Sequence, residues 1–127
     1  MQNILTITRS AGSDLSARQF FAVKATADGG CDLAGANERV LGVLTNDPKA
    51  GGAAAVQVAG VARVVAGGAF AAGDYLKSDA AGKAVKQTGE AAGTLVEVFA
   101  VALEAAAADG DQVEVLLARA VVNNAAT

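Results

Sequence analysis

The chain contains no histidine, and this absence removes most familiar catalytic chemistry at once. Ser-His-Asp and Cys-His nucleophiles both need an imidazole base, and many metal sites need imidazole ligands. The single cysteine, Cys31, excludes an internal disulfide and a zinc site built from several cysteines. We therefore expect Cys31 to be a small, partly buried apolar side chain, and we expect no metal and no cofactor.

Aromatic and clustered basic side chains are also scarce. The 127 residues include four Phe, one Tyr and no Trp, too few and too dispersed for a platform that stacks nucleic-acid bases. The net charge is −3 and the basic residues are scattered singly, which argues against binding to nucleic acid or to an anionic membrane. No stretch approaches the roughly 20 apolar residues of a membrane helix, and residues 1–9 lack the features of a signal peptide.

Alanine and valine supply most of the apolar content, with 32 Ala and 16 Val in the chain. Alanine removes little surface from water, because burial is worth only about 0.8 kcal/mol per CH₂. A domain of this length can bury about two-thirds of its surface without a disulfide or metal, but its core is thin. A thin core favours additional burial against a partner or against copies of the same chain, so we expect a homo-oligomer.

Apolar residues recur mostly at every second position, in short segments separated by Gly, Asp and Asn. This is the pattern of strands. In residues 112–118, Val113, Val115 and Leu117 share one face while Glu114 points the other way. Further strands are predicted over residues 3–8, 20–24, 40–44, 55–58, 61–65 and 95–103. We predict an all-β fold: a compact β-barrel or β-sandwich with short hairpins and at most one or two short helical turns, at residues 14–19 and 104–108.

Glycine and aspartate mark the turns between these strands. Residues 77–83 predict a hairpin loop with Gly82 at a positive φ, and residues 108–111 predict a second turn. Gly60 separates two apolar segments, which predicts a bulge or a tight bend. We divide the chain into an N-terminal segment at 1–15, a β domain at 16–120 and a C-terminal tail at 121–127 that frays.

Carboxylates are the remaining groups that could support chemistry. Asp109, Asp111 and Glu114 lack the other ligands of a calcium loop, so we interpret them as turn and strand residues. Glu97 and Glu104 would be the acid and base of a small hydrolase, although the chain is short for building the cleft that such an enzyme needs. Elimination favours a binding or structural module with no catalytic residues and no small-molecule substrate.

An ordered series of short motifs runs from about Leu41 to Leu117. The series comprises residues 42–46, 51–52, 55–64, 66–68, 72–79, 82–84, 102–105 and 108–115. In this order and spacing it resembles the small capsid cement, or head-decoration, proteins of tailed phages. Members of that family commonly carry a glycine two residues before the Ala-Leu-Glu segment, where this chain has Ala100.

The resemblance implies a compact β-barrel or β-sandwich without catalysis or cofactor. It implies attachment to the outer surface of an expanded phage head, often as a trimer near a local threefold axis. The implied partners are the major capsid protein and further copies of the chain, and the implied location is the virion after assembly in the host cytoplasm, which suits a free thiol. The alternative is another phage or cell-surface β-rich binding module of the fibre, tail or carbohydrate-binding type.

Two segments are candidate contacts with the shell or with a neighbouring subunit. Residues 1–9 are apolar at alternate positions and form either a contact arm that adds as a strand to a shell edge or the first strand of the domain. The candidate contact residues in this segment are Gln2, Ile4, Ile7 and Arg9. Residues 95–103 are apolar on both faces apart from Glu97, as in a central strand or one half covered by a neighbour. Their candidate contacts are Phe99 and Val101.

Overall fold

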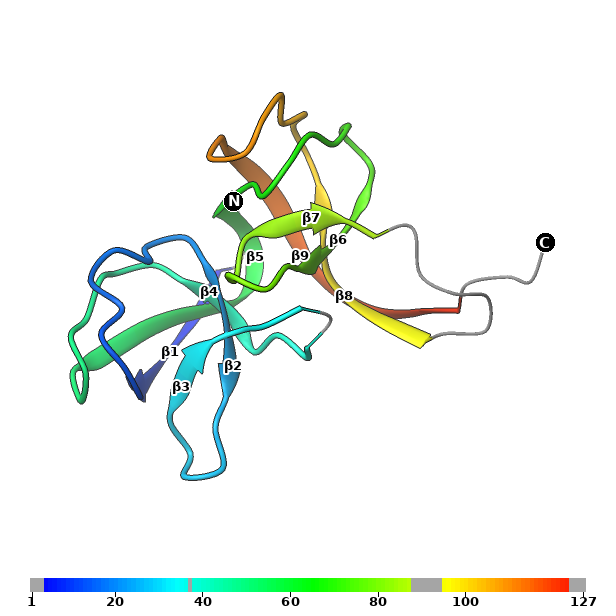
Figure 1. Ribbon diagram of the computed structural model, residues 1–127. Coiled ribbons are helices and arrows are strands. Elements are labelled where there is room, and N and C mark those ends of the chain that lie inside the picture. Colours follow the sequence, from blue (N-terminus) through cyan, green and yellow to red (C-terminus); the bar gives the residue numbers. More distant parts are fainter. Residues whose placement is uncertain (1–3, 37, 88–94, 124–127) are drawn as a thin grey trace.

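A computed structural model describes residues 4–36, 38–87 and 95–123 of the chain (Figure 1). The described residues form strands without any helix, so none of their elements is a helix that could cross a membrane. The strands are β1 (Leu5–Ser10), β2 (Ala22–Ala25), β3 (Cys31–Leu33), β4 (Gly42–Leu44), β5 (Ala53–Val65), β6 (Tyr75–Ser78), β7 (Ala84–Lys86), β8 (Leu95–Ala102) and β9 (Gln112–Asn123). The predicted all-β class is confirmed, and residues 14–19 and 104–108 form turns and irregular connections instead of helical turns.

The strands form one curled antiparallel sheet in the order β3-β2-β4-β5-β9-β8-β6-β7, with β1 paired to β5 outside this path. Strand β5 belongs to two halves of this sheet. Its residues 53–59 pair with β1 and, at two positions, with β4, whereas residues 60–65 pair with β9. We call β1–β4 with the start of β5 the first half, and the end of β5 with β6–β9 the second half. Figure 1 shows β5 running from one half into the other.

Strand β5 changes partners at Gly60, where φ is +93°. Glycine adopts this left-handed conformation without steric cost. The buried Gln57 side chain supports the change, because its amide nitrogen donates to the carbonyl of Ala59 at 3.1 Å and to that of Val61 at 2.8 Å. Gly60 therefore marks a bend as predicted, but the prediction of two separate strands was wrong: β5 is a single strand of 13 residues.

The turn between β6 and β7 contacts β2, and this contact joins the two halves of the curled sheet. The Ala22 N–H donates to the Gly82 carbonyl at 2.7 Å, and Gly82 has the predicted positive φ, at +80°. A Cβ atom at position 82 would lie 2.9 Å from Leu33 Cδ1 and 3.0 Å from the Ala22 carbonyl oxygen. Glycine is required here both by the backbone conformation and by the close approach of β2 and β3.

Two apolar clusters fill the interior. The larger lies between the two halves, and the smaller lies under β1 and the start of β5. Ten of the 26 buried apolar side chains among the described residues are alanines, as the composition led us to expect of the core. Cys31 is fully buried in the smaller cluster, more deeply than expected, and this burial raises the pKa of its thiol.

The predicted faces of β9 are confirmed, whereas the predicted start of β2 was wrong. Val113 and Val115 are buried and Glu114 is exposed, so the register of β9 follows the alternation in its sequence. Strand β2 begins at Ala22 because Phe20 has φ +71° and lies in a turn. A local backbone conformation that an apolar pattern does not encode therefore shortens the predicted strand.

Candidate interaction surfaces

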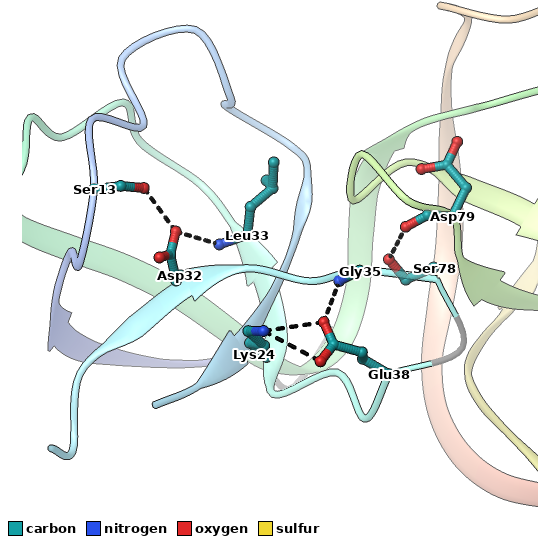
Figure 2. A network of polar contacts seen from close by, with 8 residues as sticks. All are labelled: Ser13, Lys24, Asp32, Leu33, Gly35, Glu38, Ser78 and Asp79. Carbon is teal, nitrogen blue, oxygen red and sulfur yellow. Dashed lines mark hydrogen bonds and ion pairs between the residues drawn. The ribbon is translucent and has the colours of Figure 1, made fainter. Parts of the chain in front are cut away.

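The polar side chains around β2 and β3 hold loops in place (Figure 2). The Glu38 carboxylate accepts from Lys24 Nζ at 3.1 Å and from the Gly35 N–H at 2.6 Å, and the Lys24 contact holds the Glu38 pKa below its usual value. The Asp32 carboxylate accepts from the Ser13 hydroxyl at 2.7 Å. Within the described residues no three acidic, histidine or cysteine side chains gather into a possible metal site. These contacts fix the loops around β2 and β3.

Glu97 and Glu104, the two carboxylates considered as an acid and base pair, have separate structural partners. Glu97 contacts Arg39 Nε at 2.8 Å, which raises the Arg39 pKa, and Glu104 accepts from the Glu114 N–H at 2.8 Å. Six residues of largely extended chain lie between the two glutamates, which places them about 20 Å apart at the rise of a strand. A glycosidase places its carboxyl groups about 5 to 10 Å apart. This pair does not have that geometry.

An apolar depression of about 250 Å³ opens where the two halves meet. Its lining residues are Val40, Leu41, Gly42, Val58, Phe99, Leu117 and Arg119. The Arg119 guanidinium donates to the Val40 carbonyl at 2.7 Å and to the Leu41 carbonyl. A small-molecule site needs polar groups that orient its ligand, and here the charged group holds the chain before β4 instead.

Strand β1 is the outer strand of the first half. It pairs with β5 from Leu5 opposite Ala59 to Ser10 opposite Ala53. No second strand pairs with β1 itself among the described residues, and directly after it Ala11 forms a single bridge with Cys31 of β3. Every residue of β1 except Ile7 is exposed. An edge strand of this kind offers unpaired backbone donors and acceptors to an incoming strand.

The candidate contacts near the N-terminus differ in their surroundings. Gln2 lies outside the described residues, and the Ile4 side chain is 53% exposed. Ile7 packs against the smaller core cluster, and Arg9 Nη1 donates to the Gly29 carbonyl at 3.2 Å. The exposed Leu5, which is 56% accessible, was not among the candidates selected from the sequence.

The outer face of the second half carries a row of apolar side chains. The register places Val61, Leu116, Val101 and Tyr75 opposite one another on β5, β9, β8 and β6. Directly opposed residues of antiparallel strands point to the same face. Leu103 follows on this face, where its N–H continues the ladder by donating to the Glu114 carbonyl at 3.0 Å. We call these five residues the apolar row.

The apolar row is substantially open to solvent. Tyr75 is 52%, Leu103 47% and Leu116 42% exposed, while Val61 and Val101 are partly buried. Of the two contacts proposed on β8, Val101 therefore lies in the row. Phe99 is only 5% exposed and belongs to the larger core cluster.

Sequence reasoning did not select Tyr75, Leu103 or Leu116. A usable signal existed for Leu116, because the alternation of β9 assigns it to the same outward face as Glu114. An apolar residue among outward positions is a candidate for contact. Tyr75 and Leu103 gave no such signal, since their neighbours on the face come from other strands.

Comparison with known proteins covers nearly the whole chain. A family model described as phage cement protein matches residues 1–117. Among solved structures, the chain is similar to the N base of the head fiber gp8.5 of bacteriophage phi29, with 25% sequence identity and a TM-score of 0.63. That similarity covers 91% of this chain and 95% of the other. No curated protein sequence matches the chain.

Proposed function

The chain belongs to the phage cement protein family, and from this premise we propose that it binds the outer surface of a phage capsid and stabilises it. The observation that carries the proposal is the extent of the family match, which includes β1 to β8 and the first half of β9. The similar solved structure is also part of a phage head. The proposed partner is the major capsid protein, and the proposed location is the virion surface after assembly in the host cytoplasm.

Such a protein acts by burying surface between units that would otherwise separate. Each copy adds a modest binding free energy, and many copies on one shell act together, so stabilisation does not need a tight single contact. The chain supplies what this role needs: a continuous sheet, an open strand edge at β1 and an exposed apolar row. The proposed role involves no turnover, no cofactor and no small-molecule substrate.

We assign the shell contact to β1. It is six residues long and rich in β-branched side chains, and it extends one edge of the first half. Strands β3 and β7, at the two ends of the sheet order, have three residues each, and such short strands discourage pairing. We propose that an extended segment of the capsid protein adds to the free edge of β1, with Ile4 and Leu5 contacting the shell.

The test is to mix purified protein with expanded, undecorated heads of its phage and to image them by cryo-electron microscopy. We expect saturable density on the outer face at symmetry-related positions, as trimers near threefold axes. A lack of saturable density on the heads would reject the function.

In the same assay the Leu5→Lys variant should bind about tenfold more weakly or worse, which corresponds to about 1.4 kcal/mol. Unchanged binding of this folded variant would reject only the assignment of β1.

The head-fiber neighbour favours a second function, in which the domain is the base on which a fibre stands. The same images separate the two functions when they are taken of complete virions. Density that ends at the β domain agrees with a cement role. Density that continues outward from each domain as a fibre indicates a base.

A further inference from the structure

We propose that the apolar row on the second half is the surface through which copies of this chain contact one another. This inference deepens the proposed function, because it names the partner of a surface that the shell contact through β1 leaves uncovered. It assigns the contacts between copies in the homo-oligomer to five particular residues. Those residues are Val61, Tyr75, Val101, Leu103 and Leu116.

The chain places several of its few large apolar side chains in the row, exposed to solvent. Its core relies on alanine, yet it exposes its only tyrosine and two leucines on one face. The other large exposed apolar residues among those described are Ile4 and Leu5, at β1. Single exposed leucines are normal on protein surfaces, but a contiguous apolar patch marks an interaction site.

The register of the strands fixes the row in place. The neighbours Ala62, Val115 and Ala102 point to the opposite face and are buried. A slip of one residue along β9 would carry Glu114 into the core, so Leu116 must face outward. The register therefore fixes the row on the outer face of the sheet, and sheet faces pack against one another at about 10 Å.

The charges beside the row fit a second copy of the same chain. Arg63 and Glu114 are direct register partners beside the row, and both are exposed. One border of the row thus carries one positive and one negative charge at opposed positions. Around a threefold axis, Glu114 of each copy meets Arg63 of the next copy, with the apolar side chains beside these pairs. An apolar centre with a charged rim is the anatomy of a protein interface.

The test measures association of the full chain by sedimentation velocity, without heads. The wild-type protein should form a closed oligomer at micromolar concentration. Leu116→Lys should weaken association at least about tenfold, because it places a charge in the centre of the interface. Leu5→Lys is the matched control, since Leu5 is also a half-exposed leucine on a strand, and it should associate as the wild type does.

Charge exchange at the border provides a second set of variants that leaves the apolar residues intact. Arg63→Glu and Glu114→Arg should each weaken association, and the double variant should restore it. These charge variants test association through the row if Leu116→Lys does not fold. A wild-type chain that stays monomeric throughout, or folded variants of both sets that associate normally, would overturn the inference.

Head binding distinguishes failure of this inference from failure of the proposed function. A monomeric Leu116→Lys protein that still binds heads, more weakly because avidity is lost, supports both proposals. An oligomeric Leu116→Lys protein that no longer binds heads would show that the row faces the shell, which overturns the inference and leaves the function intact.

Discussion

A side chain at position 82 would destabilise the fold in two ways, through backbone strain and through steric contact, and variants can measure the two effects separately. We expect Gly82→Ala to lower the free energy of unfolding by about 1–3 kcal/mol, because the left-handed φ is strained and the new Cβ meets Leu33 and the Ala22 carbonyl oxygen. Urea unfolding followed by circular dichroism measures the loss.

Gly51→Ala is the matched control for this experiment. Gly51 has nearly the same φ, +78°, but nothing lies within 4 Å of a Cβ placed there. Its substitution should cost only the conformational part, about 1 kcal/mol. Equal losses for the two variants would mean that the contact between the β6–β7 turn and the first half contributes little to stability.

Single residues were most predictable where local chemistry decides the structure. Gly82 and Gly110 have the left-handed backbone that their turn sequences predicted, because aspartate and glycine favour such turns regardless of the rest of the fold. The exposure of Phe99 was not predictable in this way. Outward and inward faces of β8 are equally apolar, so its sequence does not say which side chains the core covers.

At the level of elements, the bend in β5 depends on a side chain from the same strand. We expect Gln57→Leu to lower the free energy of unfolding by about 1–3 kcal/mol, because the carbonyls of the partly buried Ala59 and Val61 lose their donor. Thermal and urea unfolding measure the effect.

The control for this variant is Gln112→Leu, at an exposed position on β9. A surface change of this kind should alter stability by no more than about 0.5 kcal/mol. A Gln57→Leu protein that is as stable as the Gln112→Leu protein would show that β5 bends without help from the amide.

Strand length limited which elements the sequence could predict, although β2 and β4, with four and three residues, were still predicted at residues 20–24 and 40–44. The longest apolar run of the chain identified β8, and alternation over residues 112–118 identified the first seven residues of β9. Strands β3, β6 and β7 have three or four residues, which is too short for a period of two to stand out. The continuity of β5 was missed because the same strand serves two sets of neighbours, and Gly60 looks the same in a sequence whether a strand ends or bends there.

At the scale of the whole molecule, the interaction surface was the least predictable feature. Positions 61, 75, 101 and 116 meet only because four strands pair in one register. No window of the sequence contains them together. The family, by contrast, was recognisable because the order of its short turn and strand motifs is itself a property of the sequence.

Assembly through the apolar row predicts that thermal stability depends on protein concentration. Association draws the equilibrium toward the folded state by mass action, at about 1.4 kcal/mol for each tenfold change in the concentration of a free partner. The melting temperature of the wild type should therefore rise between low and high micromolar concentration. That of Leu116→Lys should stay constant, and the opposite pattern would contradict assembly through this surface.

A single backbone segment of 13 residues, β5, lies between β1 and the strands that carry the apolar row. Outward pressure inside a filled head stretches whatever ties its capsomers together. In the proposed assembly the shell holds β1 and a neighbouring copy holds the apolar row. The tension between these two contacts is then carried by the covalent backbone of β5, since no separate domain interface lies between them. The hydrogen bonds flanking β5 are then loaded in shear, so that several must break at once before the two halves part.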